Sequence, residues 1–272
     1  MLFSNMKKIS APAFPLIFVR ILLCSFFLFL FLIPAVSTNV FAEELSLVTP
    51  LAPYAVFRTW SAFSLPEGST SISYGIERSK DPSFYRHTLG ISYGWSDRAE
   101  VTLDLPYVDN LQGGSGFEDF GGAFKYRVQG EGRYTPAASV LVMGYLPTGR
   151  DILSRDGGVG GGAALSRKLG PILAHANFIY TISGKNDLKD EMDFLTGLEF
   201  AASHNLKMLG EFQLRKSAFS NKVDLSEVRF GYRYSSGDVY NTIGAGFDLK
   251  NRHPEFRLMI AFGASFERES RR

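Results

Sequence analysis

The sequence predicts an all-β protein, a transmembrane antiparallel up-and-down β-barrel of about twelve strands that is preceded by a cleaved signal peptide. Between Thr70 and Phe266, apolar and polar residues alternate in runs of about ten, the length that one tilted strand needs to cross a bilayer. The chain is rich in aromatic and small residues, with 24 Phe, 12 Tyr and 27 Gly among 272 residues. Beyond the first 36 residues, no apolar run approaches the roughly 18 residues of a membrane helix. A membrane protein with this sequence therefore has to be built from strands.

The first 42 residues have the layout of a secretory signal peptide. Lys7 and Lys8 precede the apolar run Ile21–Val36, and the small residue Ala42 follows at an A-x-A-like cleavage site. Residues 1–42 are therefore expected to be removed and are excluded from the fold. The length of the apolar run leaves an uncleaved helical anchor as the alternative.

Charge and cysteine usage exclude several classes of function. The only cysteine, Cys24, lies in the predicted signal, so the mature chain would carry no disulfide and no thiol nucleophile. Three of the 29 basic residues also lie there, which leaves 26 against 27 acidic residues and a net charge of −1. Such a balance does not indicate a nucleic acid as partner. No two of the four histidines have metal-ligand spacing, so neither a metal nor another cofactor is expected.

Residues 43–68 differ from the rest of the mature chain in their proline content. Pro50, Pro53 and Pro66 exclude a central strand, because proline cannot donate to a sheet ladder. Four aromatic residues of this segment need a dry environment. They are Tyr54, Phe57, Trp60 and Phe63. The segment is expected either to fold into the lumen as a plug or to lie across the periplasmic mouth, and the plug is favoured.

Residues 69–267 are assigned to the barrel and residues 268–272 to a C-terminal tail. Alternation with a period of two predicts twelve strands. They span residues 70–78, 84–95, 99–108, 119–128, 137–146, 159–168, 172–182, 192–202, 206–215, 225–234, 240–249 and 255–266. Tight turns such as 96–98 alternate with longer polar loops such as 147–158. Bacterial barrels have short periplasmic turns and longer outer loops, so we expect the outer membrane of a Gram-negative-type envelope, with both termini in the periplasm.

The outward face of each strand is the one whose residues are apolar. Leu89, Ile91, Tyr93 and Trp95 share one face of residues 84–95, and small residues share the other. Charged residues are expected inside, since a Lys or Arg that faces lipid at the midplane costs about 2 to 4 kcal/mol. The lumen-lining candidates are Glu100, Asp104, Lys125, Arg127, Glu199, Lys207, Glu211, Arg215, Glu227, Arg229, Arg233 and Arg257. They predict either a constriction that selects among solutes or a structural network of paired charges, and their mixed signs favour the network.

A soluble β-sandwich would show the same alternation, but with a polar face rich in Lys, Glu and Thr. Here that face carries many glycines, among them Gly75 and Gly90, which leave room inside a tight barrel. Tyrosines near the strand ends are expected in the aromatic girdles at the two membrane interfaces. They are Tyr107, Tyr126, Tyr180, Tyr234 and Tyr240.

The last predicted strand alternates from Phe256 to Phe266. A final strand that ends on an aromatic residue resembles the C-terminal signal that the outer-membrane insertion machinery reads. The expected partners are therefore this barrel insertion machinery and outer-membrane lipid. The residues after Phe266 depart from the pattern, since such chains often stop at the aromatic residue.

Four stretches resemble a known family of outer-membrane barrels. They are Tyr93–Val101 (YGWSDRAEV), Asp119–Arg127 (DFGGAFKYR), Leu146–Gly149 (LPTG) and Ser166–Pro171 (SRKLGP). These stretches resemble the family named after the meta-pathway of phenol degradation, and Pro53–Gly75 is similar to a related uncharacterised barrel family. The resemblance implies an outer-membrane barrel with a part in the passage of aromatic or other apolar compounds. It carries over no catalytic or binding residue.

The sequence and the resemblance together predict a passive channel or transporter for small apolar or aromatic solutes. A non-conducting structural or partner-binding barrel is the alternative. A lipid hydrolase is a third hypothesis, because His175 and Asn177 share the inward parity of residues 172–182. The chain lacks the His-x-Ser-Asn-Gly stretch of the outer-membrane phospholipases, so an enzyme is not expected.

Overall fold

The computed structural model describes residues 56–80, 83–111, 114–149, 153–154, 156–184, 190–217, 225–250 and 256–266. The predicted signal peptide, Tyr54 of the predicted plug and the predicted C-terminal tail lie outside these residues. Among the residues described, no helix is long and apolar enough to span a bilayer.

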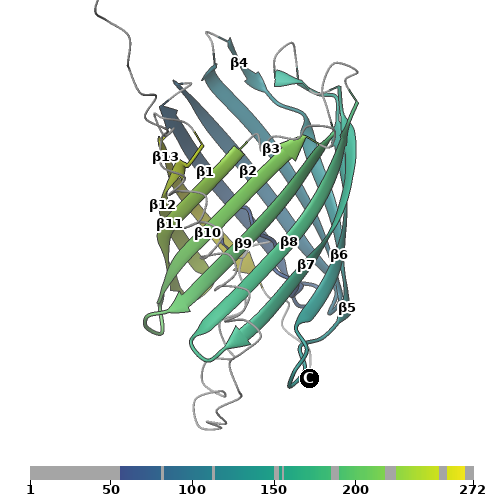
Figure 1. Ribbon diagram of the computed structural model, residues 1–272, viewed down its shortest axis with the longest axis vertical. Coiled ribbons are helices and arrows are strands. Elements are labelled where there is room, and N and C mark those ends of the chain that lie inside the picture. The colour runs from purple at the N-terminus through teal and green to yellow at the C-terminus, as the bar shows by residue number, and fades with distance from the viewer. Residues whose placement is uncertain are drawn as a thin grey trace, which may run out of the picture. The chain divides into compact units, whose positions relative to one another are not determined.

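The described strands form one antiparallel sheet that closes on itself into a barrel (Figure 1). They are β1 (Thr70–Lys80), β2 (Ser83–Ser96), β3 (Ala99–Leu111), β4 (Gly114–Phe117), β5 (Phe120–Gln129), β6 (Ala137–Leu146), β7 (Gly158–Leu169), β8 (Ile172–Ser183), β9 (Glu191–Ala201), β10 (Leu206–Ser217), β11 (Leu225–Ser236), β12 (Val239–Asp248) and β13 (Phe256–Phe266). Every strand except β4 belongs to the ring, and β1 closes it by pairing with β13 from Thr70↔Phe266 to Ser79↔Arg257. The predicted twelve-stranded barrel is confirmed.

The short strand β4 lies between the predicted strands 99–108 and 119–128, where the alternation predicts no strand. It pairs with β3 at Tyr107 and Val108. The partner on that side of the ring, β5, pairs with β3 only from Ala99 to Asp104. The end of β3 near Leu111 therefore extends beyond its pairing with β5, and β4 pairs with it there.

Tight turns connect β2 to β3, β7 to β8 and β11 to β12 at one end of the barrel, which we call the short-turn end (Figure 1). Here β7 connects to β8 and β11 connects to β12 through two residues each. Gly170 and Gly237 take φ values of 60° and 57° in these turns, a left-handed conformation that favours glycine. The start of β1 and the end of β13 meet at the same end, as an even number of ring strands requires.

Apolar side chains cover the outer face, as the alternation predicts. Trp95, Leu103, Phe230 and Phe262 are among the large hydrophobic residues exposed there. A row of rings crosses β1 to β5, with neighbouring centroids 5.3 to 6.4 Å apart. The row consists of Tyr74, His87, Tyr107, Phe117 and Phe120. It is typical of an interfacial girdle.

The prediction that Tyr240 belongs to a girdle is wrong. Tyr240 is buried and shares the inward parity of β12 with Thr242. Its ring lies 5.1 Å from the Arg233 guanidinium and against Gly263, where a side chain would collide with the ring. The alternation along β12 therefore directs Tyr240 into the lumen, and the missing side chain at Gly263 makes room for its ring.

Candidate functional site

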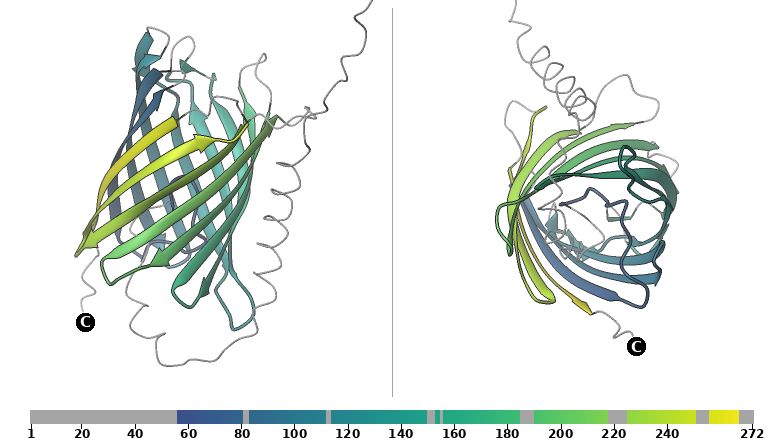
Figure 2. Two further views of the ribbon diagram at one scale, coloured as in Figure 1. Left: turned by 60° about the vertical axis from the view of Figure 1, so that its left-hand side comes forward. Right: turned by 90° about the horizontal axis from the view of Figure 1, so that it is seen from below.

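The lumen is occupied by the chain that precedes β1, residues 56–69, which we call the inner segment. Seen from below, it runs inside the ring of strands (Figure 2). Val56, Thr59, Trp60, Ala62 and Leu65 of this segment are almost completely buried. Of the predicted plug residues, Phe57, Trp60 and Phe63 lie inside the barrel, where Phe57 and Phe63 pack against buried clusters.

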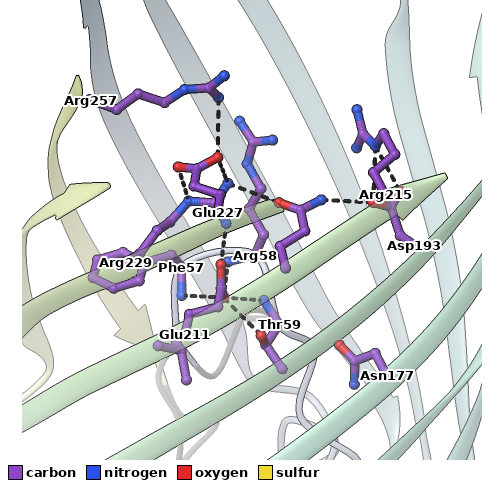
Figure 3. Close-up of polar contacts among 12 residues, drawn as sticks. Phe57, Arg58, Thr59, Asn177, Asp193, Glu211, Arg215, Glu227, Arg229 and Arg257 are labelled. Atoms are coloured by element: carbon purple, nitrogen blue, oxygen red, sulfur yellow. Dashed lines mark hydrogen bonds and ion pairs between the residues drawn. The ribbon is translucent and has the colours of Figure 1, made fainter. Parts of the chain in front are cut away.

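Glu211 on β10 is the main anchor of the inner segment (Figure 3). Its Oε2 accepts hydrogen bonds from the backbone N–H groups of Phe57, Arg58 and Thr59 at 3.2, 2.7 and 2.8 Å. The Thr59 hydroxyl donates to the same oxygen at 2.8 Å. The other oxygen, Oε1, is bound by the guanidinium of Arg229. The carboxylate is buried, and these charge-assisted bonds offset the cost of its desolvation.

Polar side chains on several other strands hold the rest of the inner segment. Asn177 on β8 accepts from Trp60 N at 2.6 Å and donates to Trp60 O at 3.0 Å. Ala62 N donates to Ser166 on β7, and Ala62 O accepts from Ser139 on β6. The contacts continue around the wall to β3, where Glu100 Oε2 accepts from Leu65 N at 2.8 Å.

Glycines of the wall provide the recesses into which the inner segment fits. A Cβ atom at Gly244 on β12 would collide with the Phe57 ring. A Cβ atom at Gly197 on β9 would come within 2.7 Å of Val56 Cγ2. The small inner face predicted from the sequence is therefore filled, at these positions, by the inner segment.

A belt of charged side chains links β1, β13, β11 and β10. Figure 3 shows the part of this belt from Arg257 to Glu211. Glu77 on β1 binds Arg58 at 3.0 Å and Arg257 at 3.1 Å. Glu227 binds Arg229 at 2.8 Å, and both side chains are buried. Burial on its own would lower the pKa of the Arg58 guanidinium, but the carboxylates of Glu77, Glu227 and Glu211 outweigh it and raise that pKa. Arg58 therefore stays charged at any physiological pH.

The twelve lumen-lining candidates all lie on the inward parity of their strands. Four of them belong to the belt, and five others form ion pairs elsewhere on the wall. Lys125 binds Glu100 at 3.0 Å, Lys207 binds Glu199 at 2.7 Å and Arg215 binds Asp193 at 2.9 Å. Arg127 instead donates to the Asp97 backbone at the short-turn end, and Arg233 donates to Thr242 and to the Val56 carbonyl. Asp104 is half-buried on β3.

The lumen also has an apolar half that was not expected. Leu141 and Met143 on β6, Ile179 on β8 and Leu195 on β9 form a buried cluster with Trp60 of the inner segment. The signal was present in residues 137–146, where both parities are apolar, as in a strand that is covered on two sides. The inner segment covers this strand on the side that faces the lumen.

His175 lies between Ser166 and Glu199, with Nδ1 2.8 Å from the serine Oγ and Nε2 3.1 Å from the glutamate. These contacts have the connectivity of a catalytic triad. However, Ser166 Oγ also accepts the Ala62 backbone N–H, and all three side chains are buried. Asn177 does not join them, because it binds Trp60. In this conformation, Ser166 binds the inner segment, and His175 and Glu199 continue the row of contacts along the wall behind it.

A cavity of about 160 Å³ remains between the inner segment and the wall formed by β1, β2, β12 and β13. It lies on the charged side of the lumen, and its lining includes Phe57, Arg58, Glu77, Arg233, Tyr240 and Met259.

Within the described residues, no group of three His, Cys, Asp or Glu side chains could hold a metal ion.

No protein-family model matches the sequence, and no curated protein does. Solved structures match the fold. An outer membrane channel from Pseudomonas putida F1 is 15% identical, with a TM-score of 0.56 over 75% of this chain and 98% of that one. The NanC porin is 10% identical, with a TM-score of 0.56 over 72% of this chain and 98% of its own. The KdgM porin in complex with disordered oligogalacturonate is 9% identical, with a TM-score of 0.55 over 72% and 99%.

At these identities the likeness shows the fold alone. The protein has the architecture of the outer-membrane channel and porin barrels.

Proposed function

We propose that the protein is a passive outer-membrane channel for small apolar or aromatic solutes and not an enzyme. The observation that carries this proposal is the cavity that stays open between the inner segment and one side of the wall. The apolar outer face and the channel fold of the structural neighbours support a place in the outer membrane. The resemblance of the sequence to the family named after phenol degradation supports the solute class, and we propose membership of that family.

In this proposal the inner segment is the constriction. Solute moves down its gradient along the β1, β2, β12 and β13 side, because the opposite side is filled by the apolar cluster around Trp60. Both termini lie in the periplasm, and the longer connections face outward.

The test is flux through the purified protein in liposomes. Swelling rates in small aromatic solutes are compared for the mature chain and for a variant that lacks residues 43–68. We expect measurable flux through the mature chain and faster, less selective flux through the deletion variant. Absence of flux in both forms, with folded barrels confirmed by their heat-dependent gel mobility, contradicts the channel.

One observation favours a second function, a closed structural or partner-binding barrel. The buried charges Lys125, Glu100, Arg229 and Glu227 are paired, so this part of the lumen is a packed interior. A mature chain that gives no flux, together with a deletion variant that does, would support a closed barrel.

A further inference from the structure

The cavity has the size of a single aromatic ring. Its volume of about 160 Å³ is close to the roughly 150 Å³ of an engineered protein cavity that binds benzene. The rings of Phe57 and Tyr240 and the side chain of Met259 form part of its lining. A flat apolar molecule would therefore bury most of its surface there.

The charges that line the cavity are predominantly positive. They are three guanidinium groups, those of Arg58, Arg86 and Arg233, and one carboxylate, that of Glu77. The side chains of Arg58 and Arg86 keep 29% and 26% of their surface exposed, so a solute can reach them. Both also form ion pairs, Arg58 with Glu77 and Arg86 with Glu118, which hold the guanidinium groups in place. Fixed guanidinium groups recognise a carboxylate by directed, charge-assisted hydrogen bonds.

We propose that the cavity is a binding site for a single-ring aromatic carboxylate, whose ring lies between Phe57, Tyr240 and Met259 and whose carboxylate meets Arg58 and Arg86. This inference rests on the proposed function, since it names the solute class of the same passage. It adds a requirement that the channel alone does not have, namely that an anionic aromatic solute binds inside the barrel and is preferred over a neutral one of equal size.

The first experiment needs no variant. Binding of benzoate, benzyl alcohol and acetate to the purified protein in detergent is measured by isothermal titration calorimetry, and flux of the same solutes is measured in liposomes. We expect benzoate to bind at least about tenfold more tightly than either of the others, because each lacks the ring or the charge. Equal binding of benzoate and benzyl alcohol overturns the carboxylate preference, and equal binding of benzoate and acetate overturns the ring site.

The second experiment identifies the residues. Arg58→Gln and Arg86→Gln are expected to weaken benzoate binding about tenfold while leaving benzyl alcohol unchanged. Arg215→Gln is the matched control, because Arg215 is another lumen arginine, 26% exposed, that binds Asp193 and does not line the cavity. Ala261→Leu, which fills the cavity from β13, is expected to weaken both ring compounds. An equal loss in the Arg215 variant overturns the assignment to this cavity.

The two experiments separate this inference from the channel function. A protein that passes solutes but shows no benzoate preference is a channel without this site. A protein that binds benzoate but gives no flux keeps the site and loses the channel.

Discussion

At the scale of single residues, Glu211 organises the lumen more than any other described side chain. Its two oxygens join the inner segment on one side to Arg229 on the other. A buried carboxylate without such partners would be strongly destabilising, so the anchor and the belt depend on each other. Removing the charge at this position should therefore affect both.

We expect Glu211→Gln to lower the free energy of unfolding by about 3 kcal/mol, because Arg229 loses one of its two carboxylate partners and the single amide oxygen cannot accept from both Arg229 and the inner segment. The measurement is urea unfolding of the refolded barrel. In a Trp95→Phe background, Trp60 reports on the inner segment, since it is buried and the sequence has only these two tryptophans. Its emission should shift to the red if the segment is released.

The control is Glu191→Gln, whose carboxylate binds Arg215 at 3.7 Å and is 24% exposed. An exposed pair of this kind contributes about 0 to 1 kcal/mol. Equal losses in the two variants would show that Glu211 has no special part in holding the inner segment.

At the scale of elements, the inner segment fits against the wall because glycines of the wall lack side chains at the points of contact. Gly197→Val is expected to displace the segment without changing any charge, because its Cβ would lie 2.7 Å from Val56 Cγ2 and 3.2 Å from Thr59 Cβ. We expect a loss of about 1 to 3 kcal/mol in the free energy of unfolding and a larger single-channel conductance in planar bilayers. Gly144→Val is the control, since a Cβ at this exposed position meets nothing within 4 Å. Unchanged conductance in the Gly197 variant would mean that the segment does not set the width of the passage.

The strands could be predicted from the sequence, but the contacts between them and the inner segment could not. Alternation with a period of two is a local property, so it gives β1 to β13, apart from β4, and the inward parity of residues such as Lys125 and Arg229. Which residues meet inside the barrel depends on the register of the strands and on residues that are far away in the sequence. Glu211 meets residues 152 to 154 positions earlier, and the Tyr240 ring fits beside Gly263 on the next strand. Neither contact has a signature in a single stretch of sequence.

At the scale of the whole molecule, the lumen has two unlike halves. The belt and the cavity lie toward β1, β2 and β10 to β13, and the apolar cluster lies along β6 to β9. The inner segment contacts both halves. Arg58 binds Glu77 in the charged half, and Trp60 packs in the apolar cluster of the other half. Any solute that passes through the barrel is therefore directed to one side.

The proposed orientation can be tested by labelling on intact cells. Ser115→Cys places a thiol on β4 at the long-loop end, and Asp238→Cys places one in the exposed turn between β11 and β12. A Cys24→Ser background removes the only natural cysteine. A membrane-impermeant maleimide should label the Ser115 variant in intact cells and the Asp238 variant only after lysis. The opposite result would place the termini outside.

The anchoring of the inner segment also has a consequence for biogenesis. Ala62 binds Ser166, which lies 104 positions later, and Arg58 binds Glu211, which lies 153 positions later. A chain synthesised from its N-terminus exposes Phe57 and Trp60 to water long before either partner exists, and closing loops of this length is slow. The inner segment is therefore translated before the strands that hold it, and it can take this position only once they exist.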